Sequence, residues 1–276
     1  MKNSFSKSIS IFDETLTTSK WLRIGTLCIL YFAQGLPWGF MLTALISFLA
    51  SKGLTIVESG QLTAMATLPW TFKLFWGPII DSFTYKKMGK RRPWILIAQI
   101  GMALSLVAMI FMGDISENIS LLGWMFFLHN CFASLQDVSC DALAVDVLLP
   151  EEQGKVNGAM WGSKIIGTGT GAAAMGTLLV SNGLVFTIIV QTILMVLIMA
   201  FLMFILERPG EKRFPWSMGS TQIDLKQSKI INPIMVVKNL LAAFSKKPCH
   251  FAALFILLSA INQGVNGAIL PVYYNS

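Results

Sequence analysis

Residues 186–206 read FTIIVQTILMVLIMAFLMFIL and contain no charged residue; the next charge is Glu207. About 20 apolar residues are enough to cross the hydrocarbon core of a bilayer, which is roughly 30 Å thick. A helix of this length in a soluble protein would show one polar face. The run therefore predicts a membrane-spanning helix.

The rest of the composition agrees with this prediction. The chain of 276 residues is 54% hydrophobic and 13% charged, whereas soluble domains carry about 25% charged residues. A net charge of +7 is better explained by basic loops of a membrane protein than by nucleic-acid binding. The sequence shows no metal-site or disulfide spacing, no expected cofactor and no apolar leader in its first 20 residues. The four cysteines are interpreted as apolar fillers: Cys28, Cys131, Cys140 and Cys249.

Apolar segments of membrane-spanning length recur along the chain. We expect an all-α membrane protein with seven such segments, at 21–50, 57–80, 93–113, 121–149, 155–180, 184–206 and 248–273.

Lys and Arg residues gather on one side of this arrangement. Of 21 such residues, 18 lie before or at the start of the first segment or in the second, fourth and sixth connections. Lys52 alone lies on the opposite side, and Lys73 and Lys164 lie within segments. Because cytoplasmic loops carry the excess of positive charge, the N-terminus and the sixth connection are predicted to be cytoplasmic.

The order of the segments predicts a domain organisation. We expect a cytoplasmic segment at 1–20, a six-helix bundle at 21–206, a cytoplasmic linker at 207–247 and the first helix of a second bundle at 248–276. Gln34-Gly35 in the first segment is echoed by Gln263-Gly264 in the seventh, as half-repeats would require; chance similarity of glycine-rich helices explains the echo equally well. Five further helices would complete a second half, so the chain is expected to be truncated.

The fourth segment carries a polar stripe. Asn130, Ser134, Asp137 and Asp141 fall within an arc of about 60° at 100° per residue. An ionised carboxylate facing lipid costs several kcal/mol, so the stripe should face the protein interior or a watery path. One interpretation is that Asp137 and Asp141 bind and release protons; the alternative is that they are permanently paired acids that hold helices together. Asp146, on the opposite face, is expected to make a helix-end contact.

Two lysines inside segments are candidate partners. Lys164 lies at the depth of Asp141 on an adjacent helix, so we expect these two side chains to pair, either as a switch or as a fixed contact. Lys73 either contacts a substrate or extends to the membrane surface.

Glycines are frequent in the fifth segment. Gly158–Gly162 and Gly167–Gly171 have the four-residue spacing that lets helices approach closely. Packing alone accounts for them, and sliding during a conformational change is the sharper alternative.

Several motifs together resemble one family. Leu36-Pro37, Phe72-Lys73-x-x-Trp76-x-Pro78-x-x-Asp81 and Gln136-Asp137-x-x-x-Asp141-Ala142-x-x-x-Asp146 are similar to the AmpG-type muropeptide permeases and the related acetyl-CoA transporters of the major facilitator superfamily. The connection after the second segment resembles the gating loop of that superfamily, although its charges could also be a topology anchor: Gly77, Asp81, Gly89, Lys90, Arg91 and Arg92.

The resemblance implies a proton-driven symporter of the inner membrane that carries anhydro-muropeptide fragments. It implies Asp137 and Asp141 as coupling acids and places basic residues at Lys73 and Lys164, with Gln34 and Asn130 as further pathway candidates. A family pathway lies between two six-helix halves, so this chain is expected to need the missing half or a second copy to transport solute.

Other classes remain open at this point. A cation-coupled sugar symporter fits the Gly89–Pro93 run and would depend on Na⁺. A membrane enzyme needs a catalytic group, but His129 and His250 are far apart and lack neighbouring motifs, so the chain is predicted not to be an enzyme. A truncated, non-transporting membrane protein is the third alternative.

Overall fold

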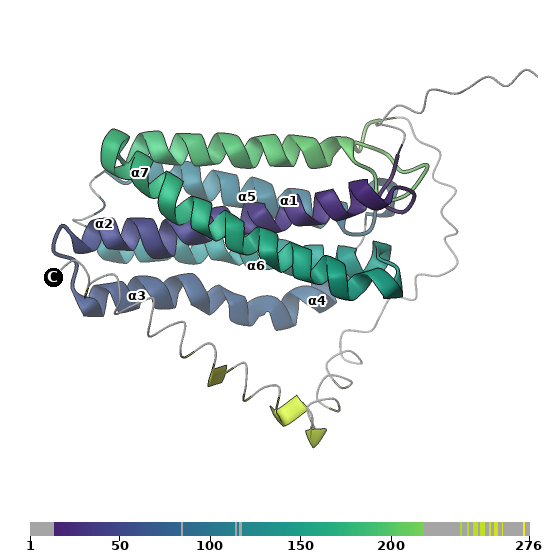
Figure 1. Ribbon diagram of the computed structural model, residues 1–276, viewed down its shortest axis with the longest axis horizontal. Coiled ribbons are helices and arrows are strands. Elements are labelled where there is room, and N and C mark those ends of the chain that lie inside the picture. Colours follow the sequence, from purple (N-terminus) through teal and green to yellow (C-terminus); the bar gives the residue numbers. More distant parts are fainter. Residues whose placement is uncertain are drawn as a thin grey trace, which may run out of the picture.

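The computed structural model describes residues 14–83, 85–113, 115 and 118–217, with isolated positions between 238 and 273. In the continuous part the chain forms a bundle of long helices that run back and forth along one axis (Figure 1). The predicted segments up to residue 206 are confirmed as helical. The predicted seventh segment, with its Gln263-Gly264 echo, lies outside the described residues apart from isolated positions.

The first crossing is one continuous helix of three parts. It consists of α1 (Lys20–Gly39), the π-helical turn η2 (Phe40–Leu45) and α2 (Ile46–Ala50). Pro37 lies inside α1 and cannot donate a backbone hydrogen bond, and such positions commonly perturb the helical ladder. The wider turn follows directly after it.

The second crossing is also composite. It begins at α3 (Ile56–Thr67), where Thr55 and Glu58 form a reciprocal capping box. It continues through the 3-10 turn η3 (Leu68–Phe72) into α4 (Lys73–Ser82). The short turn η4 (Lys86–Met88) leads to α5 (Arg92–Ile110).

Two further long helices complete the described bundle. They are α6 (Ile119–Val147) and α7 (Pro150–Phe204). Gly183 interrupts α7 with a φ of 83° and a ψ of 174°, a conformation open to glycine. The chain reverses along the bundle within α7 (Figure 1), so α7 contains both predicted segments, 155–180 and 184–206.

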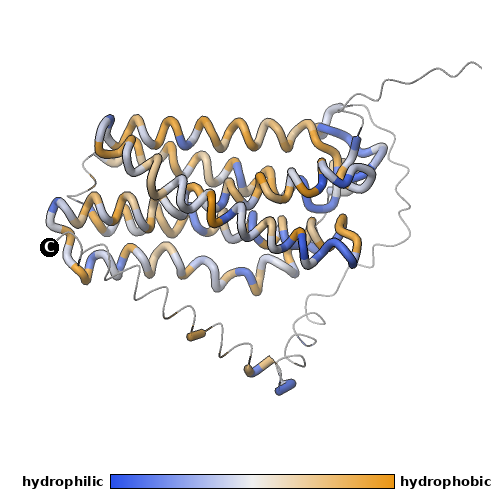
Figure 2. Tube along the Cα trace, viewed as in Figure 1, coloured by the Kyte–Doolittle hydropathy of each residue, from blue (hydrophilic) through white to orange (hydrophobic). Residues whose placement is uncertain are grey.

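Several helices satisfy the length and composition of a membrane span. Within the described part these are Lys20–Ala50, Arg92–Ile110 and Pro150–Phe204. Large apolar side chains such as Phe111 and Val180 lie exposed on the outside, and apolar residues run along the helices in Figure 2. Exposed apolar faces on long helices are the expected surface of a protein surrounded by lipid.

The closest helix contact joins α1 to the first half of α7. A Cβ atom at Gly35 would collide with the carbonyl oxygen of Lys164, and one at Gly171 with that of Leu36. Gly39 and Gly167 make equivalent contacts with Thr168 and Phe32. Two glycine pairs of four-residue spacing therefore face each other, and the contact fixes the backbone that carries Lys164.

The other predicted glycine pair behaves differently. Gly158 and Gly162 have no described atom within 4 Å of a Cβ built on them. The prediction of close packing is thus confirmed for Gly167–Gly171 and not for Gly158–Gly162 within the described part of the chain. The reason is that Val156 and Met160 are the buried residues of this part of α7, whereas Gly158 is exposed.

One end of the bundle, called here the basic end, gathers hydrophilic residues (Figure 2), among them Lys90, Arg91 and Asp146. Parts of the predicted N-terminal segment (1–20) and of the predicted linker (207–247) pack against this end. The amide of Leu16 donates to the carbonyl oxygen of Leu206 at 2.9 Å, and Glu207 is 1% exposed. The bundle therefore extends past both predicted boundaries, because residues 14–19 and 205–217 pack across its end.

Candidate functional site

The polar stripe of α6 faces neighbouring helices of the bundle. Asn130, Ser134 and Asp137 are buried, whereas Asp141 is exposed in the described part of the chain. Another polar side chain of α6 meets a different helix: Gln136 Nε2 donates to the carbonyl oxygen of Leu30 in α1 at 3.1 Å.

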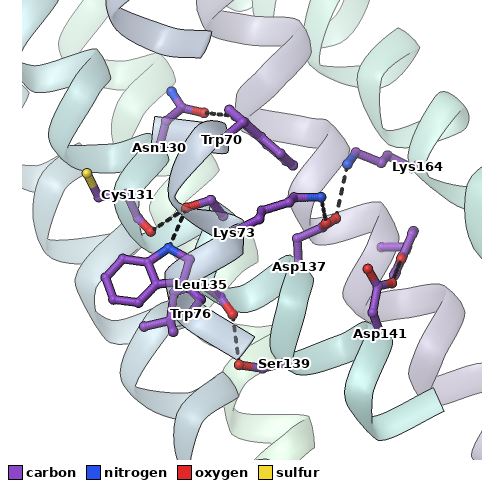
Figure 3. A network of polar contacts seen from close by, with 12 residues as sticks. Trp70, Lys73, Trp76, Asn130, Cys131, Leu135, Asp137, Ser139, Asp141 and Lys164 are labelled. Atoms are coloured by element: carbon purple, nitrogen blue, oxygen red, sulfur yellow. Dashed lines mark hydrogen bonds and ion pairs between the residues drawn. The ribbon is translucent and has the colours of Figure 1, made fainter. Parts of the chain in front are cut away.

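A second stripe, from η3 and α4, lies against the first. Trp70 Nε1 donates to Asn130 Oδ1 at 3.3 Å, and Trp76 Nε1 donates to Ser134 Oγ at 2.9 Å. Lys73, which lies between the two tryptophans, reaches Asp137 (Figure 3). The spacing of three residues puts Trp70, Lys73 and Trp76 on one helix face. This spacing was available in the sequence, but the two tryptophans were not predicted as partners of the stripe.

Asp137 is the centre of the site. Its Oδ2 atom pairs with Lys73 Nζ, and its Oδ1 atom lies 3.3 Å from Lys164 Nζ (Figure 3). The exposed fractions of the side chains are 4% for Asp137, 12% for Lys164 and 38% for Lys73. One carboxylate thus joins three helices, α4, α6 and α7, and Lys73 does not extend to the membrane surface.

Asp141 has a different partner from the predicted one. The Tyr31 hydroxyl of α1 donates to Asp141 Oδ1, and Lys164 pairs with Asp137 instead. The expected Asp141–Lys164 pair is therefore wrong for this conformation. Asp137 lies about one turn from Asp141 on α6, a distance that the Lys164 side chain can span. Asp141 is already hydrogen-bonded to Tyr31.

Aromatic rings surround the two ammonium groups. Lys164 Nζ lies 4.6 Å from the centroid of Trp70, 5.1 Å from Trp161 and 5.8 Å from Tyr31. Lys73 Nζ lies 4.7 Å from the centroid of the same Trp70 ring. These distances suit cation–π attraction, which partly replaces the hydration that a buried ammonium loses.

Gln34 is buried in α1 at 3% exposure, and neither amide atom has a hydrogen-bond partner among the described residues. The structure does not bring it into the Asp137 network, so its place in a pathway stays a prediction.

The predicted gating-loop residues meet at the basic end. Arg91 joins Asp81, at 2.6 Å, to Asp146, at 2.8 Å, and Lys90 lies 3.4 Å from Asp146. The expected helix-end contact of Asp146 is thus present. Gly77 has open space around it in α4.

Glu207 caps the N-terminus of α5, which has no side-chain cap from its own N-cap residue. Its carboxylate accepts the amides of Lys90 at 2.9 Å and Arg91 at 2.8 Å, and also that of Arg92. Gly89 has a φ of +106° there, and a Cβ on it would lie 2.7 Å from the Glu207 carboxyl carbon. This glycine is therefore required both by its backbone conformation and by the approach of Glu207.

Arg92 ties this cap to the end of α7. Its side chain is 1% exposed and donates to the carbonyls of Leu202, Met203, Lys212 and Arg213. Neither Glu207 nor the carbonyl partners of Arg92 were predicted. The 207–210 stretch was predicted as the start of a linker, and Glu207 lies more than 100 residues along the chain from the loop that it caps.

Comparison with known families decides the class. Residues 27–276 match the model of the Major Facilitator Superfamily. The chain belongs to that superfamily. It is a family of membrane transporters, so the chain is a transporter-family protein and not an enzyme. His129 Nδ1 lies 2.9 Å from Ser105 Oγ, and this pair is a buried polar contact.

Individual relatives agree with this assignment. The anhydromuropeptide permease of Escherichia coli K12 is 33% identical over 147 residues, which are 50% of this chain and 29% of that protein. A Rickettsia conorii protein named after the AmpG transporters is 29% identical over 159 residues, 55% of this chain and 37% of that protein. An uncharacterised membrane protein of Saccharomyces cerevisiae is 32% identical over 148 residues, 45% of this chain and 26% of its own length. The alignments thus cover well under two thirds of each relative.

Proposed function

We propose that this superfamily member takes part in proton-coupled symport of a muropeptide-like solute by alternating access, with Asp137 and Asp141 as the coupling acids. The observation that carries the proposal is the Asp137 carboxylate, 4% exposed and bound to ammonium groups of two other helices. The solute class rests on the likeness to the permease of E. coli, which is named for anhydromuropeptides.

The network offers a physical means of coupling. Ionised Asp137 attracts Lys73 of α4 and Lys164 of α7, and so holds these helices to α6. A proton on Asp137 removes the negative charge, and the attraction between the helices is then lost. Helices that are tied in one protonation state and released in the other can exchange between two packings.

Asp141 supplies a second, more accessible acid. It is exposed in the described part of the chain and accepts the Tyr31 hydroxyl. Asp141 lies one helical turn from Asp137 towards the basic end, which is the cytoplasmic side in this proposal. A proton can pass between water and Asp137 by way of this residue.

The function is tested by uptake into proteoliposomes that contain the complete gene product carrying this sequence. Radiolabelled 1,6-anhydro-N-acetylmuramyl peptide should accumulate when the lumen is more alkaline than the outside, and a protonophore should abolish the accumulation. Replacement of Na⁺ by K⁺ should leave uptake unchanged. Uptake that follows the Na⁺ gradient and ignores the pH gradient would contradict proton coupling and favour the cation-coupled sugar symporter.

A further inference from the structure

We propose that Lys73 and Lys164 are a binding site for a carboxylate group of the transported solute, and that ionised Asp137 occupies this site when no solute is bound. The inference rests on the proposed function, because it assigns the solute class to the same site. It adds that the solute is an anion and that Asp137 is its competitor.

The geometry is that of a two-point carboxylate clamp. Each oxygen of Asp137 takes one ammonium group, Oδ2 from Lys73 and Oδ1 from Lys164. A carboxylate of a solute presents the same two oxygens, so it can replace Asp137 without any change in what the lysines bind. Charge-assisted hydrogen bonds of this kind are among the stronger ones in proteins.

The charge balance explains why the exchange requires a proton. With Asp137 ionised, the two lysines share its charge and that of Asp141 nearby. When Asp137 is protonated, an ammonium group is left without a counter-ion inside the bundle, which is unfavourable in a membrane interior. A solute carboxylate supplies the missing charge, so the proton and the anion are each favoured by the presence of the other.

The groups that face Asp137 from all sides fit this scheme. They are the cations Lys73 from α4 and Lys164 from α7, the hydroxyl-bearing Tyr31 from α1, and Asp141 and Cys140 from α6 itself. Lys73 and Lys164 are the cations of this set, so the binding of an acidic solute group falls to them.

The aromatic rings keep the clamp in position while its occupant changes. The Trp70 ring contacts both ammonium groups, with its centroid 4.7 Å from Lys73 Nζ and 4.6 Å from Lys164 Nζ. Trp38 packs edge-to-face against Trp70, with ring centroids 5.2 Å apart, and so supports this ring. The backbone of Lys164 is fixed by its contact with Gly35. Lys73, with 38% of its side chain exposed, is the open side from which a solute approaches.

The test is equilibrium binding by the purified complete gene product in detergent, with no pH gradient. The probes are N-acetylmuramic acid, a sugar that bears a carboxylate, and its uncharged methyl ester. The acid should bind about tenfold more tightly than the ester. Lys73→Gln and Lys164→Gln should each remove most of this preference. Lys52→Gln, at an exposed lysine that lies over Phe48 at 4.6 Å, is the matched control and should keep it.

The distinguishing variant is Asp137→Asn. Removal of the internal competitor should tighten binding of the acid several-fold near pH 8 and abolish the pH dependence of acid binding that we expect of the wild type, while ester binding stays the same. Equal binding of acid and ester by the wild type, or weaker acid binding by Asp137→Asn, would overturn the inference even if the lysine variants fail to fold. Proton-driven uptake would in that case still support the proposed function; conversely, selective acid binding without proton-driven uptake would retain this site and reject the coupling.

Discussion

Glu207 at the basic end and Asp137 in the centre of the bundle are both buried carboxylates, but they take their hydrogen bonds from different donors. Glu207 accepts three consecutive backbone amides, those of Lys90, Arg91 and Arg92. Asp137 is bound by the tips of two long side chains, Lys73 and Lys164. Backbone amides at a helix start cannot leave without unwinding the helix, whereas lysine side chains change rotamer readily.

The two regions therefore differ in how easily they can rearrange. The basic end connects residues 14–19, the start of α5 and residues 205–217 through contacts that hold in one arrangement. The central network connects α4, α6 and α7 through one charge that a proton can remove. We therefore expect the first region to govern stability and the second to govern transport.

The largest expected effect on folding comes from Glu207→Ala in the purified complete gene product. It leaves three amides at the start of α5 without their acceptor, which should cost about 3 kcal/mol or more. Thermal unfolding in detergent should show a decrease in Tm of roughly 5–10 °C. Glu207→Gln keeps one acceptor oxygen, so its Tm should lie between those of the wild type and Glu207→Ala. An unchanged Tm in the alanine variant would contradict the role of this cap.

A smaller effect concerns Glu211 in the same region. It accepts the amides of Glu207, at 3.0 Å, and Arg208, at 3.2 Å. Burial, and after it the charge of Glu207, raises the pKa of this carboxyl to about 7 from 4.5. An acid whose pKa is raised on folding binds more protons in the folded state, so its contribution to stability declines as pH rises from about 4.5 to 7 and stays reduced above that.

Glu211→Gln removes this loss while keeping an acceptor oxygen. The variant should therefore unfold at a Tm a few degrees above the wild type at about pH 8 and show no such gain at about pH 4.5. The check is Tm measured across this pH range in one buffer series. A gain of the same size at both pH values would mean that the ionisation of Glu211 is not its cause.

Most of the fold followed from hydropathy, because membrane helices are set by long apolar runs. The boundary between 155–180 and 184–206 fell at Gly183, where the structure reverses. Residues 207–217 were assigned to a linker. The contact of Glu207 with residues 90–92, which packs them against the bundle, joins positions far apart in the chain, and no periodicity reveals it.

The site was predictable only in part for a similar reason. Helical spacing placed Asn130, Ser134, Asp137 and Asp141 on one face, and the structure agrees. The partner of each acid depends on the register between helices. The predicted depth of Lys164 was correct only to within about one turn, so Lys164 was paired with Asp141 instead of Asp137. The glycine contacts that set this register, Gly35 with Lys164 and Gly171 with Leu36, need both helices in place to be recognised.

Proton coupling by Asp137 is tested most directly by comparing wild type and Asp137→Asn in proteoliposomes of the complete gene product. Two rates are measured: uptake driven by a pH gradient, and exchange of labelled for unlabelled solute at equal pH. Glu58→Gln, an acid-to-amide change at the cap of α3 and outside the network, is the control. If Asp137 carries the coupling proton, Asp137→Asn loses the acceleration by the pH gradient and retains exchange. If Asp137→Asn still accelerates with the gradient as the wild type does, Asp137 is a fixed helix contact and the coupling lies elsewhere.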